Sequence, residues 1–471
     1  MQTLLVLLNV AIIISPANAL LSAESAKTIQ GQSPRFNATY ESTIQNGKNF
    51  DLLGINYSGV DYFNQINFTS KLASSGLTYM NNKPNDITFT PTRKGATTAQ
   101  ATDSNGDIFG PDSVAERTTG SITADWYYTT TAGSESLLNA TQKAQTFCEL
   151  AIAGVVPYIK VGGPIILKTS YGDPISQNYP DSTIAITKNP QNKFNIELND
   201  PVCYASPSLT YATGVYDPGT PLKFNPAAGF IPQATIANNF PTMGGDGLFF
   251  NLVVAGVNVQ APGITWSATS TPSASNVTAT VAAEKSILSS ASNLNYRANT
   301  MVMVTLRGPV ASSFEIGATA PKFTGATTIK VTGTDTSVTP NRVVASYQFQ
   351  IKNWYVTRST VNGLLTTQTA WCSGLGSYRI PTASELTTAT GLGWTGITTT
   401  NNYQRIVGAS LFGEWGPVYA YSKTYGGIAE FYGTSYWTSS KVGSSLFYVN
   451  NLGTISAGST SFNAPVACRS I

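Results

Sequence analysis

Four cysteines constrain the fold of this 471-residue chain more than any other feature. They are Cys148, Cys203, Cys372 and Cys468. A small number of widely spaced cysteines, with no close Cys-x-x-Cys pair, is typical of an oxidising compartment and argues against a zinc site. The spacing favours pairing of the first with the second and of the third with the fourth, although the sequence permits three connectivities. Each bridge would close a long loop and stabilise one domain.

Length and composition predict several β-rich domains. At about 100 to 200 residues per domain, the chain corresponds to three or four of them. Charged side chains make up only 11% of the residues, and the formal net charge is +3. A surface of Ser, Thr, Asn and Gly with few charges suits extracellular β-modules. The sequence has no Lys/Arg cluster, so we expect no nucleic-acid partner.

The N-terminus has the pattern of a secretion signal. A mostly apolar run, residues 4–14, is followed by Pro16 and the small-residue pattern Ala-Asn-Ala. These features predict a signal peptide over residues 1–19. The run is shorter than the roughly 20 apolar residues that a bilayer requires. No later stretch is long enough either, and we expect no transmembrane segment.

Short alternating runs of apolar and polar residues, separated by turn clusters, predict tandem β-domains before the C-terminal region. The apolar run Phe249–Val254 has the composition of a central strand. A connector rich in Pro and Gly at residues 217–221 marks a domain boundary. The expected domains are an N-terminal β-domain over residues 20–125, an Ig-like β-sandwich over 126–225 with the Cys148–Cys203 bridge, and a further Ig-like β-sandwich over 226–355.

The last part of the chain, residues 356–471, changes character. Residues 367–372 predict a short helix. A second helix is predicted after Thr382, because Glu385 follows three residues later in the spacing of a capping box. The strands expected to close this region are 446–449 and 464–468. The pattern predicts a compact α+β domain whose ends are joined by one disulfide.

This region contains an ordered set of motifs. They are Trp371-Cys372, Arg379-Ile380-Pro381-Thr382, Gly413-Glu414-Trp415-Gly416, Tyr436-Trp437-Thr438-Ser439 and Val466-Ala467-Cys468-Arg469. The set resembles the enterobacterial invasin/intimin-like adhesins, in which bacterial Ig-like domains carry a C-terminal C-type lectin-like domain. The resemblance implies a mainly β chain: tandem Ig-like β-sandwich domains followed by an α+β C-type lectin-like domain over residues 356–471, closed by Cys372–Cys468.

The resemblance also implies a function. It predicts an adhesin, secreted or displayed on a bacterial cell surface after passage through the periplasm, that binds a host cell-surface protein or glycoprotein through its last domain. Family members usually carry their own outer-membrane β-barrel, whereas here the signal pattern leads directly into β-domains. The chain therefore resembles a separately exported branch that uses a partner β-barrel for export or anchoring. The alternative is a non-adhesive exported assembly or structural subunit that works with a partner outer-membrane protein.

Carboxylates are scarce in the predicted lectin-like domain. Residues 356–471 contain no Asp, and their only carboxylate side chains are Glu385, Glu414 and Glu430. Calcium takes about six to eight oxygen ligands, several of them carboxylates. A run at residues 103–107 begins like an EF-hand loop but lacks its Gly and its final Glu, so we interpret it as a polar turn. We expect binding without calcium, and no metal or cofactor.

Seven residues of this domain are candidates for receptor contact. They are Trp415, Tyr419, Tyr421, Lys423, Tyr432, Tyr436 and Lys441. They occupy a Gly-rich stretch with the composition of loops, and aromatic residues beside basic ones are typical of interface hot spots. The alternative is a place in the core, because a Trp in a small domain is more often buried than exposed.

The composition argues against catalysis. The chain contains no histidine, which excludes Ser-His-Asp and Cys-His mechanisms and His-ligated zinc. The C-type lectin-like fold also resembles formylglycine-generating enzymes, but the cysteines that act there have expected disulfide partners here. The 24 Asp and Glu residues show no local pairing of the kind that cleaves glycosides. We therefore expect no enzymatic activity.

Overall fold

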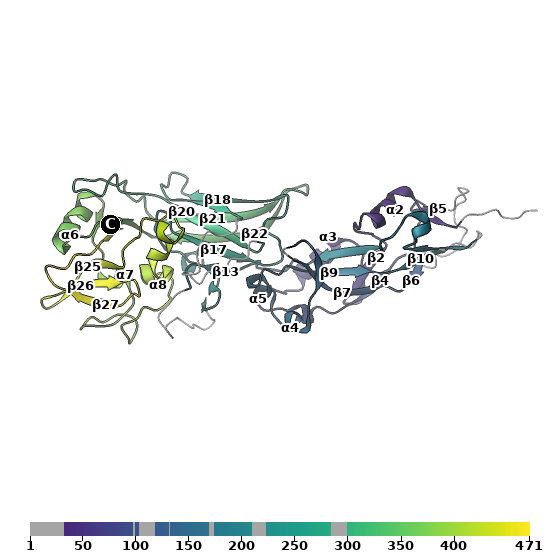
Figure 1. Cartoon of the computed structure of the whole chain (residues 1–471), viewed down its shortest axis with the longest axis horizontal. Coiled ribbons are helices and arrows are strands. Elements are labelled where there is room, and N and C mark those ends of the chain that lie inside the picture. Colours follow the sequence, from purple (N-terminus) through teal and green to yellow (C-terminus); the bar gives the residue numbers. More distant parts are fainter. Residues whose placement is uncertain are drawn as a thin grey trace, which may run out of the picture. The chain divides into compact units, whose positions relative to one another are not determined.

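The computed structural model describes residues 33–97, 99–102, 118–130, 132–168, 174–209, 223–283 and 299–471 (Figure 1). The predicted signal peptide, the turn at 103–107 and the connector at 217–221 lie outside this range. The described chain is mainly β, with several small and largely antiparallel sheets. None of the helices in these ranges is long and apolar enough to cross a membrane.

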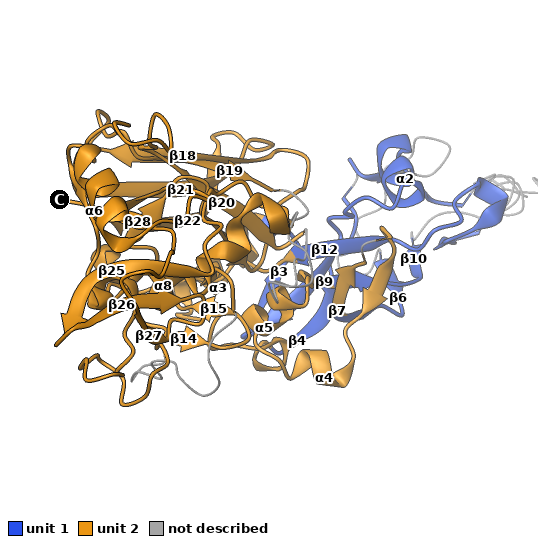
Figure 2. Cartoon of the chain, turned by 60° about the vertical axis from the view of Figure 1, so that its left-hand side comes forward, with its two compact units in different colours: residues 1–65, 88–125, 160–194 blue, residues 66–87, 126–159, 195–471 orange. Residues whose placement is uncertain are grey.

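The chain divides into two compact units (Figure 2). Unit 1 comprises residues 1–65, 88–125 and 160–194, and unit 2 comprises 66–87, 126–159 and 195–471. Three of the boundaries fall inside the strands β7 (Thr123–Thr129), β9 (Pro157–Gly162) and β12 (Gln191–Asn195). These strands belong to a four-stranded sheet with the order β12-β9-β7-β8.

The described part of unit 1 is built from small antiparallel sheets, the short helix α2 and the 3-10 helix η3. Its strands pair in the orders β1-β5, β3-β2-β4 and β11-β10-β6. The elements are β1 (Arg35–Phe36), α2 (Ala38–Gln45), β2 (Leu53–Tyr57), β3 (Val60–Tyr62), β4 (Phe89–Arg93), β5 (Ala101–Thr102), β6 (Thr118–Gly120), β10 (Ile165–Lys168), β11 (Ser176–Tyr179), η3 (Ser182–Ile184) and β12 (Gln191–Asn195).

Aromatic side chains form the centre of unit 1. The Phe36 ring centroid lies 5.3 Å from that of Phe50 and 4.9 Å from that of Tyr179. The Tyr179 hydroxyl accepts a hydrogen bond from the Phe36 amide at 3.0 Å and donates to the Glu41 carboxylate at 2.9 Å. The buried hydroxyl is thus fully satisfied, as a tyrosine in a core requires.

Unit 2 contains a β-sandwich of two antiparallel sheets, with the orders β14-β15-β13-β17-β20-β19 and β18-β21-β22. Its strands are β13 (Val202–Ser206), β14 (Phe224–Asn225), β15 (Gly229–Phe230), β17 (Phe249–Val254), β18 (Ile264–Thr271), β19 (Thr278–Ala282), β20 (Met301–Arg307), β21 (Thr327–Asp335) and β22 (Arg342–Ile351). Further elements are α3 (Gln65–Ser74), η1 (Pro84–Asp86), β8 (Glu135–Leu137), α4 (Ala140–Lys143), α5 (Phe147–Ile152) and η4 (Ile236–Asn238).

The apolar pattern of the strands explains how the two sheets pack. All six residues of β17 are buried, as expected for a central strand, whereas β21 alternates buried and less buried positions. Phe250 of β17 contacts Phe349 of β22 across the sandwich, with ring centroids 5.5 Å apart in an edge-to-face arrangement. The two sheets therefore share one hydrophobic core.

The first disulfide joins helix α5 to the sandwich. Thr146 and Glu149 form a capping box at the start of the helix, each side chain accepting from the other's backbone amide. Cys148, in the first turn of α5, is bonded to Cys203 on β13. Thr300 donates its hydroxyl to the Ala151 carbonyl at 2.8 Å and holds the end of the same helix.

The C-terminal region combines short helices with two small sheets, β16-β23-β28-β24 and β25-β26-β27. Its elements are β16 (Met243–Gly245), β23 (Asn353–Thr357), α6 (Leu365–Gly374), β24 (Tyr378–Arg379), α7 (Ala383–Leu386), α8 (Leu411–Trp415), η6 (Val418–Tyr421), η7 (Lys423–Tyr425), β25 (Ser435–Val442), β26 (Ser445–Asn450), β27 (Ile455–Gly458) and β28 (Ala467–Ser470). Cys372 on α6 is bonded to Cys468 on β28.

Strand β23 connects the sandwich to the C-terminal region without a linker. Only Lys352 separates it from β22. It pairs in parallel with β16, which lies between the sandwich strands β15 and β17 in the chain, and antiparallel with β28 at the chain end. The boundary expected between residues 355 and 356 therefore lies inside a strand of this sheet. The division into four domains stays a prediction.

The fold class is confirmed: the chain is mainly β and ends in an α+β region closed by a disulfide. Both expected cysteine pairings are present. Helix α6 covers the helix predicted at 367–372, and α7 begins after Thr382 as predicted. The Glu385 carboxylate accepts the Thr382 amide at 2.8 Å, which is the half of the capping box that depends on Glu385.

Replacing both Cys372 and Cys468 with Ser should lower the free energy of unfolding of unit 2 by about 2 to 4 kcal/mol, because the bridge closes a loop of 96 residues. Urea unfolding followed by tryptophan fluorescence measures this, since all seven tryptophans lie in unit 2. An unchanged unfolding midpoint would show that the packing of α6 against its neighbours suffices without the bond.

Candidate functional site

The seven candidate contact residues fall into two groups. Trp415, Tyr421 and Tyr436 are buried, with at most 1% of each side chain exposed. The other four, Tyr419, Lys423, Tyr432 and Lys441, are half-buried or exposed. Only the second group is available to a partner in this structure. Trp415, Tyr421 and Tyr436 instead lie in the core, which was the alternative interpretation of these residues.

The buried aromatic residues hold the C-terminal region against the sandwich. The Trp415 indole N–H donates to the Met243 carbonyl at 2.8 Å. The Tyr421 hydroxyl donates to the Trp415 carbonyl at 2.9 Å and accepts the Ser208 amide at 2.6 Å. Burial raises the pKa of Tyr421, so that the phenol stays protonated and able to donate. Loss of either ring would leave a cavity and unpaired backbone groups.

A buried carboxylate lies beside this aromatic core. Glu414 accepts hydrogen bonds from the Thr242 amide at 2.8 Å, the Thr242 hydroxyl at 2.5 Å, the Met243 amide at 2.9 Å and the Gly408 amide at 2.7 Å. Burial raises the pKa of Glu414, and these hydrogen bonds oppose that rise. The carboxylate thereby ties α8 to the start of β16.

Arg405 is a second buried charge in the same core. Its guanidinium donates to the Ser208 carbonyl at 2.8 Å and to the Glu414 backbone carbonyl at 2.6 Å. It also lies over the rings of Phe224 and Phe230, 4.9 and 5.4 Å from their centroids. Burial lowers its pKa from the ordinary value of an arginine. The guanidinium connects the loop before α8 to strands β13 to β15.

The segment after α8 folds back on itself into a closed loop. The Ala429 amide donates to the Tyr421 carbonyl at 3.0 Å, and Ser422 and Ala429 form an isolated parallel β-bridge. Gly427 permits this closure, because a Cβ there would lie 1.9 Å from the Tyr421 carbonyl oxygen. The loop is thus anchored at the buried Tyr421 and presents the residues between 422 and 429 outward.

Five side chains around this loop form what we call the aromatic patch. They are Tyr419, Lys423, Tyr425, Ile428 and Tyr432. The rings of Tyr419 and Tyr425 meet edge to face with centroids 5.3 Å apart. Half-buried tyrosines in and beside an anchored loop combine a large apolar area with a polar hydroxyl, which suits recognition of a protein surface.

An ion pair fixes the basic residue of the patch. The Lys423 amine donates to the Glu430 carboxylate at 2.7 Å. This hydrogen bond raises the pKa of Lys423, and Tyr432 also raises it. The other Glu430 oxygen accepts the Ser359 hydroxyl at 3.0 Å. Glu430 therefore ties the patch to the backbone just beyond β23.

Lys441 lies elsewhere, on the exposed end of β25 beside Val442. Tyr425 and Ile428 belong to the aromatic patch, although the sequence patterns do not single them out. Tyr425 follows Lys423 by two positions in the same Tyr- and Gly-rich segment, which was a usable signal. The sequence gives no signal for Ile428, because an apolar residue after two glycines is equally compatible with the core.

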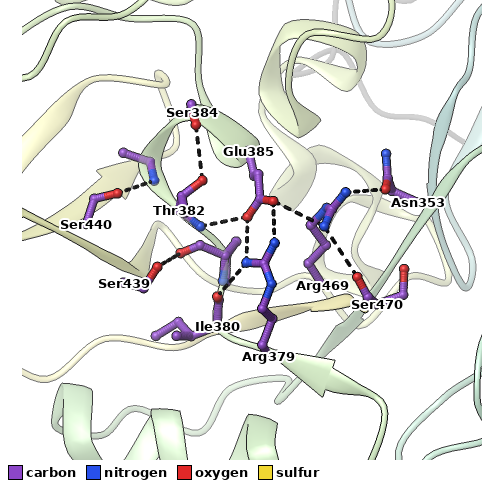
Figure 3. A network of polar contacts seen from close by, with 12 residues as sticks. Asn353, Arg379, Ile380, Thr382, Ser384, Glu385, Ser439, Ser440, Arg469 and Ser470 are labelled. Carbon is purple, nitrogen blue, oxygen red and sulfur yellow. Dashed lines mark hydrogen bonds and ion pairs between the residues drawn. The ribbon is translucent and has the colours of Figure 1, made fainter.

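A network of polar contacts joins α7 to the mixed sheet of the C-terminal region (Figure 3). Arg379 of β24 holds Glu385 of α7 through two hydrogen bonds, at 2.8 and 2.5 Å. Arg469 of β28 reaches the same carboxylate at 3.1 Å and also bonds Asn353 of β23. The Glu385 carboxylate therefore links α7 to β24 and β28, and Arg469 extends the network to β23.

This network sets the ionisation of Glu385. Burial alone would raise its pKa, but the hydrogen bonds from Arg379 and the Thr382 amide, with the charge of Arg469, outweigh burial and hold the pKa below its ordinary value. Within the described residues, no three Asp, Glu or Cys side chains gather where they could hold a metal ion. The three carboxylates of the C-terminal region instead bond to arginine, lysine and the backbone.

Fold and site together define a mainly β protein whose disulfide-closed α+β region displays an aromatic patch. No protein-family model and no curated protein match the chain. Among solved structures, it is similar to invasin, described as a bacterial integrin-binding protein, with 12% identity and a TM-score of 0.32. That match covers 89% of this chain and 58% of the invasin chain. The chain thus spans less than two-thirds of the length of that protein.

Glu385→Gln should lower the free energy of unfolding at pH 7 by about 1 to 3 kcal/mol, the range of a hydrogen-bonded charge. Because the folded chain lowers the pKa of Glu385, its contribution is present above the unfolded pKa of about 4.3 and is lost as the pH falls through the folded value. Urea unfolding at pH 7, 5 and 3 tests this.

The control is Glu315→Gln, which neutralises an exposed carboxylate in the same unit. The difference between the wild type and Glu385→Gln should shrink toward acid pH. A difference that stays constant from pH 7 to pH 3 would mean that shape, and not charge, is what Glu385 contributes.

Proposed function

We propose that this chain is an exported, non-catalytic adhesin that binds a protein or glycoprotein on a host cell through the aromatic patch. The observation that carries this proposal is the display of Tyr419, Tyr425 and Tyr432 around a loop that is anchored from below by buried Tyr421. The ordered motifs that resemble those of the invasin/intimin-like adhesins lie in the same region.

The anchoring supports a binding role on energetic grounds. When a contact loop becomes ordered only on binding, the entropy cost of ordering it lowers the binding affinity. Here the loop is closed by the Ala429 bond and held by the Lys423–Glu430 pair before any partner arrives. Tyrosine also brings large contact area with only two side-chain torsions to fix. The patch is therefore preorganised.

The disulfides support export. Each of the two disulfides joins a helix to a strand. Disulfide bonds persist in oxidising compartments and are rare in the cytosol. An oxidising route through the periplasm to the cell surface or the medium fits this chemistry. The proposed location is thus outside the bacterial cytoplasm.

The proposal includes binding without calcium. Glu385, Glu414 and Glu430 are the only carboxylate side chains of residues 356–471, and each accepts hydrogen bonds from other groups of the chain. A calcium ion would have to displace arginine, lysine or backbone donors to recruit them. A chelator should therefore leave binding unchanged.

Replacing Tyr419, Lys423 and Tyr432 together with Ala should weaken binding of the disulfide-intact chain to host cells by about a hundredfold or more, since hot-spot truncations each cost more than about 1 kcal/mol. Titration of labelled protein on cells, with and without chelator, measures this. The three side chains lie outside the core, so the urea midpoint should stay near that of the wild type.

The matched control replaces Tyr57 and Tyr128, two half-buried tyrosines outside the C-terminal region, with Ala. Equal binding by the patch variant and the wild type would refute the patch as the contact surface. If the wild type binds no host cell but copurifies with an outer-membrane protein, the assembly-subunit alternative replaces the adhesin proposal.

A further inference from the structure

A second surface of the C-terminal region is built on a tight turn at residues 391–394. Gly391 and Trp394 exchange two backbone hydrogen bonds, at 3.0 and 2.8 Å. The two residues between them both have positive φ, 54° at Leu392 and 80° at Gly393. These values fit a two-residue turn of type I′.

Leu392 departs from the chemistry of this turn. The first central position of a type I′ turn favours Asn, Asp or Gly, and a leucine there is strained because its Cβ crowds the backbone. Its side chain nevertheless points into solvent, with 51% of its surface exposed. Neither backbone preference nor core packing explains a leucine at this apex. A residue that is unfavourable for its backbone conformation and is not compensated by packing indicates a functional role.

Other exposed or half-buried apolar residues lie close to Leu392, either in space or in the sequence. A Cβ at Gly393 would lie 3.3 Å from Val442, which is 40% exposed at the end of β25. Ile397, three residues beyond the turn, is 62% exposed. Trp394 is half-buried, and its indole nitrogen is buried without a hydrogen-bond partner among the described residues. We call Leu392, Trp394, Ile397 and Val442 the apolar tip.

The chain around the apolar tip is almost free of charge. Residues 386–404 contain no charged side chain, and residues 431–468 contain only Lys441. Lys441 directly precedes Val442 and is exposed. The tip thus combines protruding aliphatic side chains, threonine hydroxyls and a single positive charge, with no carboxylate in either stretch.

We propose that the apolar tip inserts into the headgroup region of a phospholipid bilayer, with Lys441 favouring anionic lipids. Leucine and valine are under-represented in hot spots of protein interfaces, whereas aliphatic and tryptophan side chains enter the membrane interface readily. The lack of carboxylates removes repulsion from anionic headgroups, and a lysine near the surface adds attraction. The proposal does not depend on the aromatic patch.

The test uses the full, disulfide-intact chain and protein-free vesicles, either of phosphatidylcholine alone or with about one-fifth phosphatidylserine. Flotation should recover the wild type with the vesicles, more with the anionic ones. Leu392→Asn should lower partitioning about tenfold, because it removes the protruding aliphatic group. It also installs the preferred Asn-Gly turn, so its urea midpoint should not fall.

The control is Leu452→Asn, which removes a leucine of equal exposure, 50%, from the turn at the other end of β26. It should bind vesicles like the wild type, while Lys441→Gln should abolish the preference for anionic vesicles. Failure of the wild type to float, or equal loss in both leucine variants, would overturn the proposal. If vesicles do not retain the wild type but Leu392→Asn weakens binding to cells, the tip contacts a protein instead.

Discussion

The C-terminal region depends on one buried carboxylate. Glu414 lies fully enclosed and accepts four hydrogen bonds, three of them from Thr242 and Met243 at the start of β16. An enclosed carboxylate without these donors would be costly, so the position of α8 and the position of β16 cannot vary independently. Trp415 and Tyr421 continue the same connection. The loop at the centre of the aromatic patch is therefore anchored, through Tyr421 and Trp415, beside the buried Glu414 carboxylate.

Much of the architecture could be predicted because it follows from local rules. The pairing of the cysteines followed from their spacing, the helix after Thr382 from its capping signal, and the central strand from the apolar run Phe249–Val254. Such signals act within a few residues or through simple loop closure. They can therefore be recognised in the sequence without knowledge of the three-dimensional structure.

The candidate site could be predicted only in part, because burial is a property of the whole fold. Nothing local distinguishes Tyr419, which is half-buried, from Tyr421, which is enclosed, although they lie two residues apart. The roles of Glu414 and Arg405 depend on partners more than 150 residues away, Thr242 and Ser208. Such long-range pairing leaves no periodic trace in the sequence.

The position of β23 has a mechanical consequence. A pull on the C-terminal region relative to the sandwich does not act on a flexible joint, because β23 lies between β16 and β28 and continues almost directly from β22. The load is shared among several ladder hydrogen bonds, and the Cys372–Cys468 bond carries it covalently from β28 into α6. Tension on the C-terminal region therefore loads the strands of this sheet directly.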